Sequence, residues 1–183
     1  MNKSRKVSLS KFLSKYLRHE PEMLGLHLSE GGWVAVADLL EACQRHGQAL
    51  THLELSEIVA DSDKKRFAFD ATGTLIRAQQ GHSVSVDLQL APATPPAVLY
   101  HGTVGAALAA IRREGLQKMN RHHVHLSPDV ETARRVGARR GKPVILAVDA
   151  AALHSAGAVF YESGNGVWLV DQVPPSYLRE LTD

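Results

Sequence analysis

Five short segments of this sequence concentrate arginine and histidine, and four of them also contain glycine, serine or threonine. They are Leu17–Pro21, Ile76–Ser83, Tyr100–Thr103, Arg121–Ser127 and Arg139–Gly141. A guanidinium group stays protonated and donates two parallel hydrogen bonds, so arginine is well suited to bind phosphate. Several such segments in one chain indicate an anionic substrate.

Arg18 and His19 stand where an expected helix ends, just before Pro21. Two interpretations are open. In the first, these basic residues at helical spacing form an ordinary solvated helix face. In the second interpretation, Arg18 and His19 leave the helix surface and project toward another lobe. Pro21 favours the second interpretation, because proline ends the helix.

Arg77 and His82 lie on a segment that the sequence predicts to be β-rich. Isolated arginine and histidine are common at strand ends, so a purely structural pair is the first interpretation. Gly81 weakens it, because a glycine permits close approach of the backbone to a ligand, and Ser83 adds a hydroxyl donor.

Three histidines, at positions 122, 123 and 125, raise the question of a zinc site. His123 and His125 share one face of an expected strand, yet no cysteine or well-spaced acid lies near them. The sequence therefore favours hydrogen bonding to hydroxyls and amides, and no metal. His101-Gly102-Thr103 follows another strand, where Gly102 would let backbone N–H groups approach a ligand carboxamide. Neither a dinucleotide-binding nor a P-loop glycine motif occurs.

The first half of the chain is predicted to hold three helices and a hairpin. Apolar residues at helical spacing from Leu9 to Leu17 predict the first helix, and residues 36–46 with Gly47 as cap predict the second. Thr51 and Glu54 have the capping-box spacing that starts the third. Alternation at Phe67 and Phe69, a turn at 72–73 and residues 74–86 then read as strands. This order is typical of a winged-helix module.

Proline-rich residues 91–97 predict a linker, which separates lobes at 1–90 and 98–183. The second lobe is predicted to be α+β and rich in strands. Strands are expected at 98–100, 123–126, 143–148, 158–161 and 167–170, and helices at 104–113 and from Ser127-Pro128 onward, with Ser127 as the cap.

Composition places these lobes in an ordinary globular protein. The chain has 183 residues, of which 44% are hydrophobic and 22% charged, with a net charge of +2. No apolar run approaches the length of a membrane span. The single cysteine, Cys43, excludes an internal disulfide, so the sequence predicts a reducing, cytoplasmic location without a membrane.

With these segments in view, the chain resembles the NAD-dependent RNA 2′-phosphotransferases, the tRNA 2′-phosphotransferases of splicing. The resemblance runs through most of the chain in order. Its motifs are residues 9–19, 32–34, 63–67, 77–83, 99–103, 123–127, 141–144, 160–161, 165–169 and 173–175. It implies an N-terminal winged-helix RNA lobe, a C-terminal lobe like the ADP-ribosyltransferases, and an active site between them.

The resemblance also implies a two-step reaction with NAD⁺ as a consumed co-substrate. An internal RNA 2′-monophosphate attacks the nicotinamide ribose and expels nicotinamide, which leaves the RNA ADP-ribosylated on its 2′-phosphate. The ribose 2″-hydroxyl then attacks that phosphate. The products are RNA with a 2′-OH and ADP-ribose 1″,2″-cyclic phosphate.

Residue roles follow from the same resemblance. The family's Arg-His-Arg-Arg set maps onto Arg18, His19, Arg77 and Arg139, with Arg140 an open alternative for the last. NAD⁺ contacts are expected at His101, Gly102, Thr103, His123, His125 and Ser127. RNA phosphate contacts are expected at Lys11, Lys15, Lys65, Arg66, His82 and Ser83. His19 is the expected proton carrier, because imidazole titrates near neutral pH. Trp33 is expected in the core of the first lobe.

Two other functions fit the same residues. One is an ADP-ribosyltransferase that modifies terminal phosphates of nucleic acid without the second step. The other is a non-catalytic winged-helix protein that binds RNA or DNA and releases no nicotinamide. The chain is expected to act as a monomer.

Overall fold

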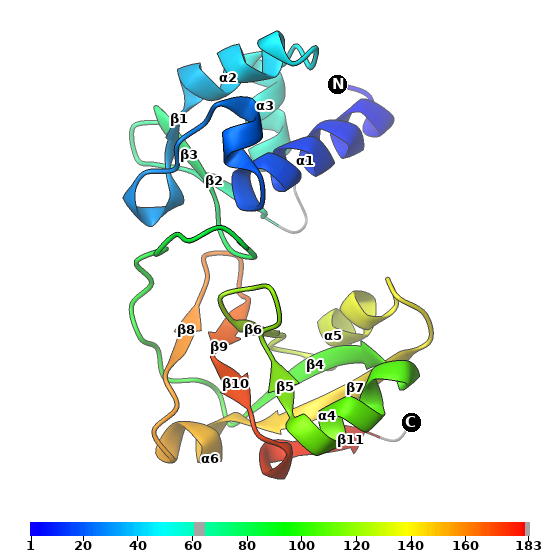
Figure 1. Cartoon of the computed structure of the whole chain (residues 1–183). Coiled ribbons are helices and arrows are strands. Elements are labelled where there is room, and N and C mark those ends of the chain that lie inside the picture. Colours follow the sequence, from blue (N-terminus) through cyan, green and yellow to red (C-terminus); the bar gives the residue numbers. More distant parts are fainter. Residues whose placement is uncertain (61–64, 182–183) are drawn as a thin grey trace. The chain divides into compact units, whose positions relative to one another are not determined.

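A computed structural model describes residues 1–60 and 65–181. The chain divides into two compact units, Met1–Gln89 and Leu90–Asp183. Each is described by itself (Figure 1). Among the described residues, none of the helices has the length and apolar character needed to cross a bilayer.

The N-terminal unit combines helices with one small sheet. Its elements are α1 (Lys3–Arg18), η1 (Pro21–Leu24), η2 (Glu30–Gly32), β1 (Val34–Ala35), α2 (Val36–Arg45), α3 (His52–Ala60), β2 (Phe67–Phe69) and β3 (Leu75–Ala78). The strands form an antiparallel sheet in the order β1-β3-β2. Three leucines of α1, at positions 9, 13 and 17, are buried against α2, α3 and the sheet in a shared core. Burial of such a side chain stabilises the fold by about 1.5–3 kcal/mol.

Local signals placed these helices correctly. Thr51 and Glu54 form the predicted capping box, because the Glu54 N–H donates to Thr51 Oγ1 at 3.2 Å and the Thr51 N–H donates to Glu54 Oε2 at 3.1 Å. Gly47 follows α2 with φ of 72°. The strand predicted over 74–86 is wrong beyond Ala78, where β3 ends. Residues 79–89 continue as an irregular segment, called the 79–89 segment below.

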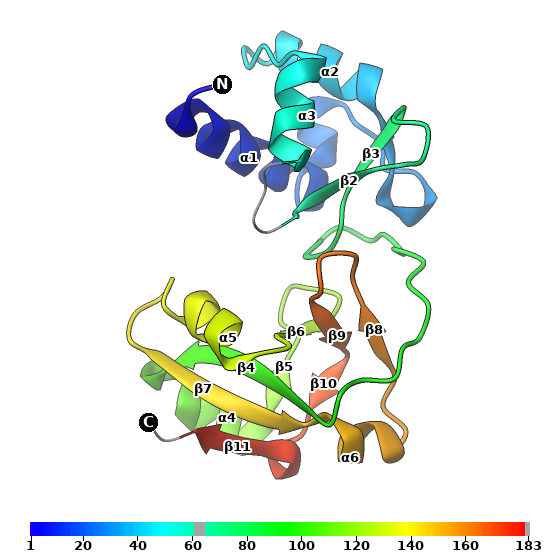
Figure 2. The same cartoon turned by 180° about the vertical axis from the view of Figure 1, so that it is seen from behind.

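The C-terminal unit is richer in strands. Its elements are β4 (Val98–Val104), η3 (Gly105–Ala107), α4 (Leu108–Glu114), β5 (Leu116–Gln117), β6 (Val124–Leu126), α5 (Val130–Gly137), β7 (Pro143–Asp149), α6 (Ala150–Ser155), β8 (Phe160–Glu162), β9 (Trp168–Val170), β10 (Gln172–Val173), η4 (Pro175–Tyr177) and β11 (Leu178–Leu181). The strands form antiparallel sheets in the orders β11-β7-β4, β6-β9-β8 and β10-β5. Figure 2 shows the same unit from behind.

This unit has its own core, in which Leu99, Val148, Phe160 and Val170 are almost fully buried. A mutual backbone pair between Tyr100 and Ser127 joins β4 to the chain directly after β6, with N···O distances of 2.9 and 2.7 Å. The mixed α and β composition with small antiparallel sheets is therefore confirmed.

Two local expectations in this unit change. The helix predicted from Ser127-Pro128 starts at Val130, and its cap is Asp129, whose Oδ1 accepts from the Thr132 N–H at 2.7 Å. Ser127 is therefore not the cap, and its backbone instead exchanges hydrogen bonds with Tyr100. The predicted linker at 91–97 belongs to this unit, where the Ala93 N–H donates to the Phe160 carbonyl at 2.8 Å.

Candidate functional site

The last turn of α1 presents Arg18 and His19 next to the 79–89 segment. The Ser83 N–H donates to the Arg18 carbonyl at 2.9 Å, and Ser83 Oγ lies 2.9 Å from His19 Nδ1. Arg18 is half-buried and His19 exposed. The helix end therefore holds a cation and an imidazole together, with a serine hydroxyl that orients the ring.

His82 and Gly81 complete this group. His82 is only 2% exposed, and its side chain lies close to Gly32, where a Cβ would stand 3.6 Å from His82 Nε2. Gly81 has φ of 88°, a conformation that favours glycine, and its open side faces the Arg18 guanidinium at 3.7 Å. We call Arg18, His19, Gly81, His82 and Ser83 the N-terminal basic cluster.

Arg77 is held differently. Its Nη1 donates to the Gly31 carbonyl at 3.1 Å and to the Leu88 carbonyl at 3.3 Å, and its guanidinium lies 4.5 Å from the centre of the Trp33 ring. Desolvation by burial lowers the pKa of Arg77. Trp33 is half-exposed and is not a member of the buried core, so the expectation that it fills that core is wrong.

The expected RNA-contacting lysines lie at the surface. Lys11 and Lys65 are exposed. Lys15 forms an ion pair with Glu20 at 3.0 Å, and the hydrogen bond to Glu20 raises the pKa of Lys15. Arg66 is half-buried, and its carbonyl accepts from the Gln79 N–H at 2.9 Å, which places it beside the start of the 79–89 segment. Asp63 and Lys64 of the same motif lie outside the described residues.

A second basic cluster lies in the C-terminal unit. His101 Nδ1 lies 3.1 Å from the His125 carbonyl, and Arg121 Nη1 lies 2.7 Å from His125 Nδ1. A carbonyl only accepts, so His101 carries its hydrogen on Nδ1 and leaves Nε2 as an acceptor. Arginine only donates, so the bonded His125 Nδ1 is the acceptor and Nε2 carries the hydrogen. The two rings thus offer one acceptor and one donor.

The charges around these rings are all of one sign. Desolvation lowers the pKa of His101, and repulsion by Arg140 and Arg121 lowers it further. Desolvation also lowers the pKa of Arg121, which Arg140 and Arg139 repel. In the described part of the chain no carboxylate forms an ion pair with any of these three arginines. We call His101, Arg121, His125, Arg139 and Arg140 the C-terminal basic cluster.

The other expected NAD⁺ contacts lie on or near β4. Gly102 faces α5 so closely that a Cβ there would stand 1.8 Å from the Ala133 carbonyl. Position 102 therefore requires glycine so that α5 can pack on β4, whether or not the backbone there also binds a ligand. Thr103 and Ser127 are each 9% exposed. His123 precedes β6, and its ring lies 5.4 Å from that of Tyr161. Desolvation lowers the pKa of His123.

No group of three or more metal-ligating side chains occurs among the residues that the structure describes. His125 is hydrogen-bonded to Arg121, and the His123 ring packs against Tyr161.

The comparison with protein families identifies the chain. Residues 4–172 match the model of the RNA 2′-phosphotransferase, Tpt1 / KptA family. The chain belongs to this family. It is similar to a protein named "Probable RNA 2′-phosphotransferase" from Nostoc punctiforme, with 58% identity over 99% of this chain and 100% of the relative. Proteins of the same name from Streptomyces coelicolor and Burkholderia pseudomallei are 59% and 55% identical, over 98% and 93% of this chain and 97% and 92% of the relatives.

The match to the RNA 2′-phosphotransferase family includes both basic clusters, because it extends through both units. The sequence did not indicate a role for Arg121, although it stands four residues before His125. In the structure, Arg121 is hydrogen-bonded to His125, which is a predicted site residue. Arg139 and Arg140 are exposed beyond α5. The signal available was the spacing of Arg121 and His125 on a stretch without acids.

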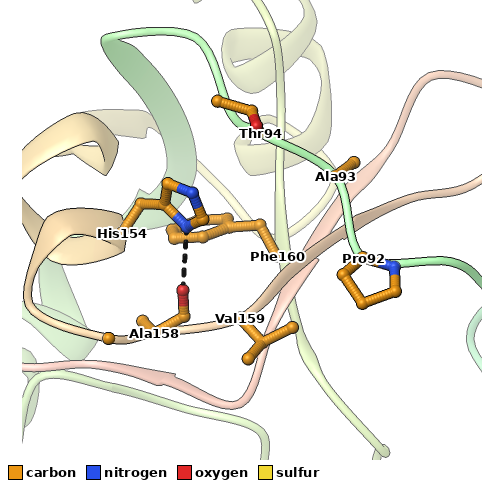
Figure 3. Close-up of a pocket in the computed structure, with 8 residues that line it drawn as sticks. Pro92, Ala93, Thr94, His154, Ala158, Val159 and Phe160 are labelled. Carbon is orange, nitrogen blue, oxygen red and sulfur yellow. Dashed lines mark hydrogen bonds between the residues drawn. The ribbon is translucent and has the colours of Figure 1, made fainter.

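The C-terminal unit of this family member also has an open cavity of about 280 Å³ beside α6 (Figure 3). Pro92, Ala93, Val159 and Phe160 form apolar walls, and His154 Nδ1 lies 3.0 Å from the Ala158 carbonyl. None of the predicted site residues lines this cavity.

Proposed function

We propose that this protein transfers an internal RNA 2′-monophosphate to NAD⁺. The products are RNA with a free 2′-OH, ADP-ribose 1″,2″-cyclic phosphate and nicotinamide. Membership of the RNA 2′-phosphotransferase family, by a match over residues 4–172, is the observation that carries the proposal.

The N-terminal basic cluster suits the RNA phosphate. Arg18 supplies a fixed positive charge at the helix end, and His82 and Ser83 stand beside it. The phosphate is already an anion, so its attack needs positioning more than deprotonation. The second step gathers negative charge on phosphorus, which cations stabilise, and needs a proton carrier, which is the role we propose for His19.

The C-terminal basic cluster suits the nucleotide. Three arginines with no carboxylate partner in the described residues favour a polyanion such as a pyrophosphate. The acceptor on His101 and the donor on His125 suit ribose hydroxyls or an amide. We therefore extend the expected NAD⁺ contacts, among them Thr103, His123 and Ser127, to Arg121.

We further propose that the N-terminal unit is a winged-helix RNA lobe and the C-terminal unit an ADP-ribosyltransferase-like lobe. The element order α1-β1-α2-α3-β2-β3, with the three strands in one small antiparallel sheet, supports the first. The lone Cys43 is buried, and desolvation raises its thiol pKa to about 11. It is not a reactive thiol. We also propose that the protein acts as a monomer in the reducing cytoplasm, where a lone cysteine forms no disulfide.

The test is incubation of the purified protein with an oligoribonucleotide that carries one internal 2′-phosphate, with and without NAD⁺. We expect NAD⁺-dependent formation of the cyclic phosphate and of 2′-OH RNA, detected by mass spectrometry, and we expect both to persist in EDTA. An oligonucleotide with only a terminal phosphate is the matched control. Stable ADP-ribosylation of that control without cyclic phosphate would favour the second candidate enzyme, and no nicotinamide release would favour the binding protein.

A further inference from the structure

The 79–89 segment is hydrogen-bonded to the rest of the unit at two places, and only one of these places lies in the N-terminal basic cluster. At the cluster end, Ser83 bonds to the Arg18 carbonyl and meets His19 Nδ1, both at 2.9 Å. At the far end, the Gly31 N–H donates to the Asp87 carbonyl at 3.0 Å. The segment thus spans from the end of α1 to η2.

Arg77 supplies the centre of the far fastening. Its Nη1 bridges two carbonyls, Gly31 on η2 and Leu88 on the segment, at 3.1 and 3.3 Å. Its Nε is buried and makes no hydrogen bond to any described residue. Nη1 of the guanidinium is therefore bonded to the backbone of this unit, whereas Nε has no partner among the described residues.

Trp33 covers the same guanidinium. The Arg77 Cζ lies 4.5 Å from the centre of the indole ring, within the range of an attractive cation–π contact. No carboxylate pairs with Arg77 among the described residues, so the indole and the two carbonyls stabilise its positive charge. Next to them a Cβ on Gly32 would stand 3.2 Å from Leu88 Cδ2 and 3.6 Å from His82 Nε2. The segment is thus packed directly on η2.

We infer that Trp33 and Arg77 are positioning residues, which hold the 79–89 segment so that Ser83 orients the His19 imidazole. The resemblance placed Arg77 in the catalytic Arg-His-Arg-Arg set, and the turnover experiment below separates that role from the positioning role. The inference rests on the proposed function only for the role of His19 as proton carrier. The effect of Trp33 and Arg77 on the His19 imidazole can be measured without substrate.

The first experiment records the ring nitrogen NMR signals of His19 in the free protein. Trp33→Leu removes the indole face without changing a charge, and Trp33→Phe keeps an aromatic face. We expect Trp33→Leu and Arg77→Gln to move the His19 signals toward those of Ser83→Ala, and Trp33→Phe to leave them near wild type. Unchanged His19 signals in Trp33→Leu and Arg77→Gln would overturn the inference, whether or not the protein has the proposed activity.

The second experiment is a double-mutant cycle on turnover. Misplacement of a reacting group by about 1 Å can cost roughly 10²-fold in rate, so we expect Arg77→Gln to lower kcat by about 10- to 100-fold with little change in the KM for RNA. The Arg77→Gln, Ser83→Ala double variant should be no slower than the slower single variant, because both act through His19. Multiplied effects with a raised KM would mean that Arg77 binds the phosphate directly.

Folding is controlled within the same set. Arg77→Lys keeps the charge but cannot bridge two carbonyls from one planar fork, and it should show part of the Arg77→Gln effect. Should Arg77→Gln fail to fold, Trp33→Leu, Trp33→Phe and Arg77→Lys carry the test. If the wild-type protein lacks phosphotransfer activity, the proposed function fails while the NMR comparison still decides the fastening.

Discussion

In the N-terminal unit, cationic and imidazole groups are stabilised by the protein itself. Arg77 lies on an indole and bonds to two carbonyls, and His19 meets a serine hydroxyl. In the C-terminal unit, desolvation lowers the pKa values of His101 and Arg121. Repulsion lowers them further, from Arg140 and Arg121 on His101 and from Arg140 and Arg139 on Arg121. In the first arrangement Arg77 Nη1 and His19 Nδ1 already have partners in the protein, whereas Arg77 Nε has none among the described residues. The repulsion in the second arrangement would be relieved by the polyanion that we propose it binds, so the two units differ in how far the protein itself balances their charges.

The largest expected effect comes from the N-terminal side of this comparison. We expect His19→Ala to slow formation of 2′-OH RNA by about 10²- to 10⁴-fold, because loss of a positioned proton carrier affects the second step. RNA carrying ADP-ribose on its 2′-phosphate should accumulate on a gel with 5′-labelled substrate. His46→Ala, at the exposed C-cap of α2, is the matched control. Unconsumed substrate without accumulation would assign His19 to binding or to the first step.

The next effect sharpens the C-terminal side. Arg121→Gln keeps a donor for His125 but removes one of the mutually repelling charges, and a charged hydrogen bond contributes about 1.5–3 kcal/mol. We expect NAD⁺ affinity to fall roughly 10- to 100-fold by calorimetry, without accumulation of an intermediate. The charge-matched control is Arg112→Gln. Arg112 lies in the last turn of α4 and pairs with Glu180 at 2.7 Å. Equal losses in both variants would mean that only net charge matters.

A smaller effect separates packing from binding at β4. A Cβ at Gly102 would overlap the Ala133 carbonyl, whereas one at Gly105 would meet nothing within 4 Å. Overpacking typically costs about 1–3 kcal/mol, so we expect Gly102→Ala to lower the free energy of unfolding in urea by at least that amount. Gly105→Ala should change it little. A stable Gly102→Ala variant with weakened NAD⁺ binding would instead show that the glycine serves the ligand.

The smallest effect lies outside both clusters. Arg5 bonds to Glu54 at 2.7 Å, and that bond, with the Thr51 N–H, lowers the Glu54 pKa to about 2. A carboxyl whose folded pKa lies below its unfolded value near 4.3 stabilises the protein above that value and loses this effect as pH falls toward the folded pKa. Glu54→Gln should therefore lower stability at neutral pH and flatten its fall on acidification. Glu41→Gln, an exposed 3.9 Å pair, should leave the acid limb unchanged.

Local patterns in the sequence determined much of this protein. The leucines of α1, the capping box at Thr51 and the glycine after α2 each depend on residues within one or two helical turns, so spacing alone predicts them. The motifs of the RNA 2′-phosphotransferase family are likewise short and contiguous, and they identified the family that the family model later matched.

Only the tertiary structure decided what the central residues touch. Arg77 meets a carbonyl 46 positions earlier, His19 meets a serine 64 positions later, and Gly102 faces the backbone of α5. Arg121 joins its cluster through Arg139 and Arg140, which lie beyond a helix. Such contacts arise when distant segments pack, and side-chain type does not tell whether an arginine will meet a carbonyl, an indole or another arginine. Sequence could therefore nominate the basic residues, while packing divided them into those that bond to the backbone and indole of the protein and those that repel one another.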